Sequence, residues 1–178
     1  MKACLLFITS AVVAVLLPLS AQASKNDLLV IAVDAPVAGW NLLKDSTIYG
    51  SGSGLADIYD GGYEVYTNAG VVEALRRMYV KGEEYIEVTV HSMKSPDAAG
   101  AFLAERYQME TEDKAPDKPG WNRFTASGIG GTTAYAVEAL YFITVVSYHG
   151  SDEGKKQTDP FIKSLLDNAV TFRRAGKR

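Results

Sequence analysis

The stretch VVEALRRMYVKGEEYIEVTVHSM, residues 71–93, decides the fold class of this chain. Two strand-like runs, Val71–Val80 and Tyr85–Met93, flank the short polar segment 81–84, an arrangement typical of a β-hairpin. Successive side chains of a strand point to opposite faces, so the second run divides into two sets. These are Ile86, Val88 and Val90 on one face and Glu87, Thr89 and His91 on the other. The pattern predicts a half-buried antiparallel sheet.

Further strands are expected on both sides of this hairpin. Three candidates follow it: Arg123–Ser127, Thr132–Val137 and Leu140–Tyr148. Both alternating sets of the last run are largely apolar, which predicts a central strand buried on both faces. Before the hairpin, Leu28–Ala35 is either a strand or an extended lead-in, and the glycine-rich segment Tyr49–Gly54 is expected to be a loop.

Two helices have recognisable beginnings. Ser95 can accept hydrogen bonds from free N–H groups, Pro96 presets φ, and Asp97 favours the positive end of a helix. The pair Asp159-Pro160 is expected to cap a final helix, with a polar loop before it over His149–Lys156. The predicted apolar helix positions are Ala98, Ala99, Phe102, Leu103 and Tyr107 in the first, and Phe161, Ile162, Leu165, Leu166 and Ala169 in the second.

These segments predict one α+β domain over residues 24–178. It has a single antiparallel sheet of about five to seven strands, with about three helices packed on it. The polar segment 109–122 contains two prolines and is expected to be a mobile, exposed loop. The basic cluster Arg173, Arg174, Lys177 and Arg178 is expected to form a frayed C-terminal tail.

The first 23 residues predict export. Lys2 supplies a positive charge, Leu5–Leu17 is apolar, Pro18 ends that run, and Ala21-Gln22-Ala23 is a small-x-small cleavage site. This is the pattern of a secretory signal peptide, and the apolar run is too short for a stable membrane span. An uncleaved anchor helix is the less favoured alternative. We therefore expect a periplasmic or secreted bacterial protein with no stable membrane span after cleavage.

Composition narrows the possible partners and cofactors. Cys4 is the only cysteine and lies within the predicted signal peptide, so the mature chain would have no disulfide and no cysteine metal ligand. The net charge is −3, which argues against an extended nucleic-acid surface. No cofactor is expected, and the expected partner is an unknown small ligand or an envelope protein.

Residues 55–70, LADIYDGGYEVYTNAG, fit two local structures. Asp60-Gly61-Gly62 between aromatic and apolar residues is typical of a hairpin turn. Apolar residues also recur at helical spacing, although two glycines within a helix would cost about 1 kcal/mol each. The sequence of this segment alone does not decide between a hairpin turn and a helix.

Two motifs in this part of the chain occur in order. The first consists of Leu55, Ile58, Tyr59, Asp60, Gly61, Gly62, Glu64 and Tyr66, and the second of Met93, Ser95, Pro96, Ala99 and Phe102 or Leu103. On these motifs the chain resembles, from about Trp40 to Tyr148, an uncharacterised family of secreted bacterial proteins, a domain of unknown function. That family's signature is Tyr-Ile-Asn/Asp-Gly-Gly-Ala-Glu-x-Tyr. Tyr63 departs from the usual small residue, and Ile58-Tyr59 inverts the usual order.

The resemblance implies a fold but no activity. It implies that the Asp-Gly-Gly segment is helical, with close packing around its glycines. The order of elements is also similar to the Mog1/PsbP-type α+β sandwich, a likeness that carries no function.

The same signature segment holds the candidate ligand-binding residues, because tyrosines combine apolar area with a polar tip. They are Tyr59, Asp60, Gly61, Gly62, Tyr63, Glu64 and Tyr66. If this segment lines a cleft, Asp60 and Glu64 become an acid/base pair with His91 nearby. Together with Asp57, the two carboxylates could hold Ca²⁺ or Mg²⁺, but a solvated acidic face is the favoured interpretation. His91 and His149 are expected to be ordinary surface histidines.

Three functions are compatible with these residues. The first is an exported, non-catalytic domain that binds a ligand or an envelope partner. The second is a hydrolase-type enzyme that uses Asp60 and Glu64 in a cleft. The third is a structural subunit of an envelope complex, which predicts a large exposed apolar patch and no deep pocket.

Overall fold

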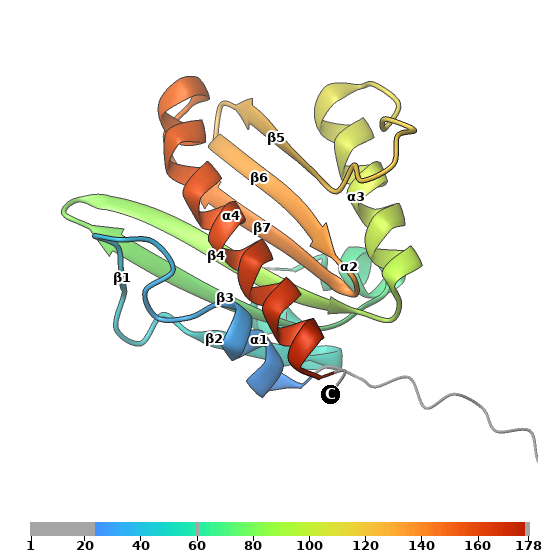
Figure 1. The fold of residues 1–178 in the computed structure, drawn as a ribbon, viewed down its shortest axis with the longest axis horizontal. Helices are drawn as coiled ribbons and strands as arrows, with labels where there is room; N and C mark the ends of the chain where they lie inside the picture. Colours follow the sequence, from blue (N-terminus) through green and yellow to red (C-terminus); the bar gives the residue numbers. More distant parts are fainter. Residues whose placement is uncertain (1–23, 60, 177–178) are drawn as a thin grey trace, which may run out of the picture.

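The computed structural model describes residues 24–59 and 61–176. The strands are β1 (Asn41–Leu42), β2 (Ile48–Ser51), β3 (Val71–Lys81), β4 (Glu84–Met93), β5 (Arg123–Gly128), β6 (Gly131–Glu138) and β7 (Tyr141–Ser147). The helices are α1 (Lys25–Ile31), the 3-10 helix η1 (Gly52–Asp57), α2 (Tyr63–Ala69), α3 (Pro96–Thr111) and α4 (Ser151–Ala175). The predicted α+β class is confirmed, with more helices than expected (Figure 1).

All seven strands belong to one antiparallel sheet in the order β1-β3-β4-β7-β6-β5, with β2 also pairing with β3. The predicted hairpin is confirmed as β3 and β4, in which Val80 lies opposite Tyr85. The strand predicted to be central is β7, which lies between β4 and β6. Alternation along these strands divides the buried residues between the two faces of the sheet.

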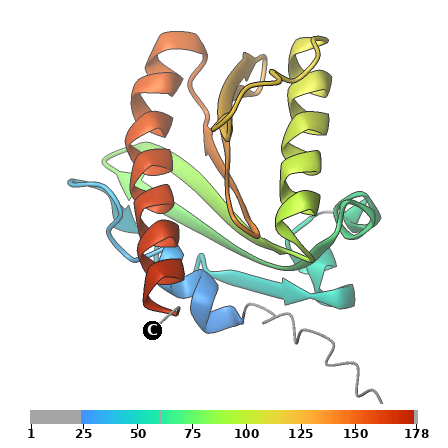
Figure 2. The ribbon, with the colours of Figure 1, turned by 45° about the vertical axis from the view of Figure 1, so that its right-hand side comes forward.

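The helices α1 and α4 cover one face, which we call the closed face (Figure 2). Ile86, Val88 and Val90 of β4 point to it, as the alternation predicted. Phe161 of α4 is fully buried there, and its ring makes edge contacts with the rings of Trp40 and Tyr79. This apolar core extends across the sheet from β3 to β6.

The opposite face, which we call the open face, is covered in part by η1, α2 and α3 (Figure 2). A second core lies under these helices and includes Leu55, Phe102 and Phe142. The beginning of α3 is as predicted, because Ser95 Oγ accepts a hydrogen bond from the backbone N–H of Ala98 at 3.1 Å. Farther along the strands the open face carries polar side chains.

Three expectations about strands and loops were wrong. Residues from Lys25 to Ile31 form a helix and not a strand, and Leu28 and Ile31 are buried against the closed face. The expected loop 49–54 contains strand β2, in which Tyr49 lies opposite Leu75. The exposed loop expected over 109–122 begins only after α3 ends at Thr111.

The last helix begins earlier than predicted, at Ser151, and Pro160 lies inside it. The first buried residues of α4 are Gly154, Gln157 and Thr158. They are small or polar, so the sequence shows no amphipathic pattern over this part of the helix. A Cβ atom at Gly154 would lie 2.2 Å from Thr132 Oγ1, so α4 lies very close to the sheet there. Arg173, expected in a frayed tail, lies in α4 with its Nε 2.7 Å from Glu138 Oε1.

The Asp-Gly-Gly segment is not one continuous helix, which corrects the expectation drawn from the resemblance. Gly61 and Gly62 have φ values of 81° and 74°, and α2 begins only after them. A Cβ atom at either glycine would meet nothing within 4 Å, so the expected close packing around them is absent. Their role is conformational, because the left-handed region is favourable mainly for glycine. Asp60, Cys4, Lys177, Arg178 and the predicted signal peptide lie outside the described residues.

Candidate functional site

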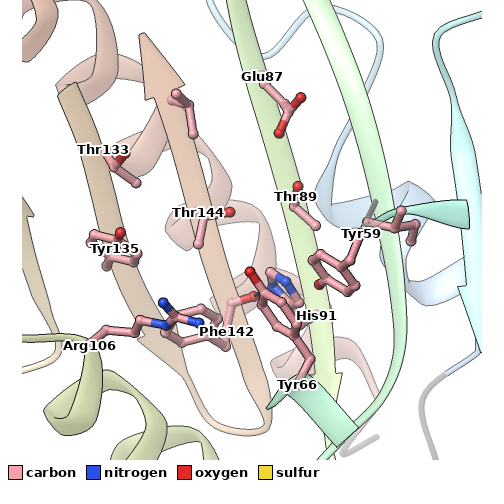
Figure 3. Close-up of a pocket in the computed structure, with 12 residues that line it drawn as sticks. Tyr59, Tyr66, Glu87, Thr89, His91, Arg106, Thr133, Tyr135, Phe142 and Thr144 are labelled. Atoms are coloured by element: carbon pink, nitrogen blue, oxygen red, sulfur yellow. Dashed lines mark hydrogen bonds between the residues drawn. The ribbon is translucent and has the colours of Figure 1, made fainter. Parts of the chain in front are cut away.

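The candidate site is a pocket of about 190 Å³ on the open face, where the cover of η1, α2 and α3 ends (Figure 3). The strands β4, β6 and β7 form its floor, and its walls come from α2, α3 and the segment Ile58–Tyr59, which follows η1. The lining residues are Ile58, Tyr59, Tyr66, Glu87, Thr89, His91, Arg106, Thr133, Tyr135, Phe142, Thr144 and Val146.

Hydroxyl groups dominate the floor. Thr89 of β4 lies opposite Thr144 of β7, which in turn lies opposite Tyr135 of β6. Thr133 lies two residues before Tyr135 and therefore points to the same face. Each threonine hydroxyl can donate one hydrogen bond and accept others, so this floor suits a polar ligand.

Two stacked tyrosines form one wall. The rings of Tyr59 and Tyr66 lie face to face, with centroids 3.6 Å apart and planes 9° apart. Arg76 Nη1 donates a hydrogen bond to the Ile58 carbonyl at 2.8 Å, which ties the start of this wall to strand β3. The left-handed glycines 61 and 62 then turn the chain so that α2 can bring Tyr66 back over Tyr59.

The Tyr59 hydroxyl is the most unusual polar group of this wall. It is buried and has no hydrogen-bond partner among the described residues. Burial raises the pKa of this hydroxyl far above its ordinary value, with a further contribution from Tyr66. The group therefore stays neutral and retains its proton, which it can donate to a bound molecule.

His91 is buried behind the stacked tyrosines and is only 1% exposed, so the expectation of a surface histidine was wrong. Its ring is nearly parallel to both tyrosine rings, with centroids 6.1 Å from Tyr59 and 6.0 Å from Tyr66. Burial lowers the pKa of His91 to about 4. Nδ1 lies 2.9 Å from the carbonyl oxygen of Phe142, which can only accept. The neutral ring therefore carries its proton on Nδ1 and offers Nε2 as an acceptor.

Arg106 extends from α3 into the pocket and is a positively charged group of its lining. Its guanidinium carbon lies 5.0 Å from the ring centroid of Phe102 and 5.4 Å from that of Tyr66. Among the described residues no carboxylate lies within 4.0 Å of it. The nearby carboxylate of Glu110 accepts instead from Tyr135 Oη at 2.8 Å.

Glu87 lines the pocket from strand β4. Burial raises the pKa of its carboxyl group, and the positive charge of Arg76 partly opposes this. Figure 3 shows Glu87 at the end of the lining opposite Arg106. The pocket therefore has a carboxylate at one end and a guanidinium at the other.

Only some of the predicted site residues meet here. Tyr59, Tyr66 and His91 line the pocket, whereas Tyr63 packs against the second core. Gly61, Gly62 and Glu64 are exposed and do not line it. The acidic face expected for Asp57 and Glu64 is not formed, because Asp57 ends η1 and Glu64 lies in α2.

Sequence reasoning missed Arg106, Glu87 and the threonines. For Glu87 and Thr89 a signal existed, since alternation placed them on the same face as His91. Arg106 had no such signal, because a basic residue on a helix usually lies in solvent.

The part of the chain that the structure describes holds no group of three or more histidine, cysteine, aspartate or glutamate residues placed to bind a metal ion. None of the helices in residues 24–59 and 61–176 combines the length and apolar character that crossing a membrane requires.

No protein-family model matches the chain, and no curated protein matches it significantly. Among solved structures, the extracellular domain of PknH from Mycobacterium tuberculosis superposes with a TM-score of 0.47 at 11% sequence identity. The match covers 84% of this chain and 93% of that chain. A likeness of this size leaves the function to be argued from the site, and the resemblance to the uncharacterised family stays a prediction.

Proposed function

We propose that this protein is an exported, non-catalytic domain that binds a small ligand in the pocket of the open face. The observation that carries the proposal is the set of polar groups without protein partners. The Tyr59 hydroxyl is buried without a hydrogen bond, and Arg106 has no carboxylate partner among the described residues. Because buried polar groups in folded proteins nearly always have partners, a ligand would complete this site.

The state of the histidine supports binding over catalysis. Catalytic bases work best when their pKa lies near the working pH, and His91, with a pKa of about 4, is a weak base at neutral pH. Glu64, its proposed partner in a hydrolase, is exposed on α2, whereas His91 is buried. The hydrolase alternative therefore rests on Asp60, which lies outside the described residues.

The surface gives less support to a purely structural subunit. The large exposed apolar side chains among the described residues are Val30, Val65, Tyr85, Met109, Ile129 and Tyr148. Most of them lie on separate elements, and only Tyr85 and Tyr148 flank paired residues of neighbouring strands. Scattered apolar residues are normal on protein surfaces and do not indicate a docking patch.

Native mass spectrometry of the protein purified from its own cells tests the binding proposal. We expect a mass above that of the polypeptide, and we expect the excess to disappear on denaturation. The variant Thr144→Val, in the pocket floor, should reduce this excess, whereas Thr125→Val, on β5 outside this pocket, should not. A bare polypeptide mass, together with no thermal stabilisation by a panel of small metabolites, would contradict binding.

The same spectrum tests export. We expect the mass of a chain that begins at Ser24, because Ala21-Gln22-Ala23 is the predicted cleavage site. A chain that retains residues 1–23 in the native cell would refute the predicted cleavage.

A further inference from the structure

The two charged groups of the pocket are far apart along the sheet. Glu87 and His91 are separated by four residues on β4, so their Cα atoms lie about 13 Å apart. Arg106 lies over the Tyr66 ring, whose centroid is 6.0 Å from that of His91. The guanidinium therefore belongs to the His91 end of the pocket, and the carboxylate of Glu87 to the other.

The Arg106 end suits a carboxylate. The faces of two aromatic rings hold the guanidinium in place by cation–π contacts. The N–H groups of a guanidinium lie in its plane and match the two oxygens of a carboxylate. The neighbouring Tyr59 hydroxyl, which has no partner among the described residues, supplies one more donor at this end.

The Glu87 end suits a hydrogen-bond donor. Arg76 lies close enough to lower the pKa of this carboxyl group, but no ion pair joins the two among the described residues. No hydrogen bond to the Glu87 carboxylate is formed by the described residues. A ligand hydroxyl or ammonium group would provide the donor that it lacks.

The volume is sufficient for a small organic molecule. An apolar cavity of about 150 Å³ binds benzene, and this pocket has about 190 Å³. Between its two ends, Thr89, Thr133 and Thr144 offer hydroxyl groups to such a molecule.

We infer that this pocket selects a small organic acid with a hydrogen-bond donor, either hydroxyl or ammonium, at the end opposite its carboxylate. Arg106 binds the carboxylate, and Glu87 accepts from the distal donor. This inference rests on the proposed function, and it names the class of ligand that the same pocket binds.

The test is an NMR titration of the ¹⁵N-labelled protein with three probes of equal chain length: pentanoate, 5-hydroxypentanoate and 5-aminopentanoate. Affinities are measured from the backbone amide shifts of Thr89 and Thr144. We expect one of the substituted acids to bind at least about tenfold more tightly than pentanoate, because a hydrogen bond to a charged group is worth that much. Pentylamine and pentanol, which lack the carboxylate, should bind at least about tenfold more weakly than the preferred acid.

Variants of Arg106 and Glu87 test which residue binds each end of the ligand. Arg106→Met should weaken all three acids at least about tenfold, and Glu87→Leu should remove the preference over pentanoate. Glu87→Gln distinguishes the two donors, because the neutral amide oxygen still accepts from a hydroxyl but loses its charge interaction with an ammonium. Glu153→Gln, on the exposed side of α4, is the control and should change nothing. The amide spectrum of each variant verifies its fold.

Two results would overturn the inference while the proposed function stands. One is equal binding of pentanoate and both substituted acids. The other is the absence of shifts with all three acids in a protein that retains a native ligand in the mass spectrum. If no probe binds and no ligand is retained, the proposed function fails together with the inference.

Discussion

The closed and open faces of the sheet are built from alternate residues of the same strands, yet they differ in what covers them. On β4, Val88 and Val90 enter an apolar core under α1 and α4, whereas Glu87 and Thr89 line a pocket. The closed face has two helices laid across it, whereas the helical cover of the open face leaves the pocket uncovered. On β4, therefore, the residues under the two helices are apolar and those that line the pocket are polar.

This difference suggests that the closed face contributes mainly to stability and the open face to binding. Burial of apolar area stabilises the fold, and the closed face supplies a large share of it. The open face holds the pocket, and the buried Tyr59 hydroxyl in its lining has no partner among the described residues. Four predictions test this division of roles.

The largest effect is expected from Phe161→Ala on the closed face. Phe161 is fully buried and packs against Trp40 and Tyr79, so its truncation leaves a cavity. We expect a loss of about 3–5 kcal/mol in the free energy of unfolding, measured in urea. Val146→Ala, on the half-buried open face, should cost only about 1 kcal/mol. Equal losses would contradict the difference between the faces.

The next effect concerns pH and His91, a buried titratable group of the open face. Burial lowers its pKa to about 4, whereas the unfolded chain has the ordinary value of about 6.5. As the pH falls through this interval, the unfolded state gains a proton that the folded state does not. The contribution of His91 to stability should therefore fall by roughly 3 kcal/mol between pH 6.5 and pH 4, and flatten below.

The difference between wild type and His91→Gln isolates this dependence. Glu73 and Glu87, whose pKa values burial raises, favour the folded state at low pH and act in both proteins. Their contributions cancel in the difference curve, which should rise with pH. A flat curve for His91→Gln would show that this ring is not desolvated.

Two glycines, one in the helix on each face, should respond with opposite signs. A Cβ at Gly154 of α4 would lie 2.2 Å from Thr132 Oγ1 and 2.3 Å from the carbonyl oxygen of His149. Gly154→Ala should therefore cost about 1–3 kcal/mol, despite the better helix propensity of alanine. Gly100→Ala in α3 meets nothing within 4 Å and should stabilise by up to about 1 kcal/mol. Thermal unfolding of both variants would show whether the signs differ.

The smallest effect distinguishes two buried tyrosines. Tyr79 Oη donates to the Val33 carbonyl at 2.7 Å on the closed face, so Tyr79→Phe should cost about 1 kcal/mol. Tyr59 Oη has no partner among the described residues, so Tyr59→Phe should be neutral or slightly stabilising. Urea unfolding of both variants measures the two changes. A loss at Tyr59 as large as that at Tyr79 would mean that its hydroxyl is already satisfied without a ligand.

Strand alternation was sufficient to predict much of the sheet. It predicted the β3–β4 hairpin, the central place of β7 and the face on which His91 lies. It did not predict that His91 is buried, because the cover comes from Tyr59 and Tyr66, which lie on other elements earlier in the chain. A residue's face is a local property of the sequence, whereas what lies above that face is not.

The helices were also harder to predict where their structure depends on packing against the sheet. The short apolar run at Leu28 fits a strand or a helix equally well, and only packing against the sheet selects the helix. In α4, the small or polar residues Gly154, Gln157 and Thr158 are buried, so hydrophobicity gave no signal there. Arg106 was missed because its place in the pocket depends on how α3 docks.

The contact between α1 and α4 has a consequence for the order of folding. Asn168 Nδ2 donates to the Ile31 carbonyl at 3.0 Å, which joins residues 137 positions apart in the chain. Contacts between such distant residues form slowly, because a long loop must close first. During synthesis Leu28 and Ile31 emerge before all their partners, which include β3 and β4 as well as α4, and α4 emerges last. Until then their apolar surface is available to a chaperone.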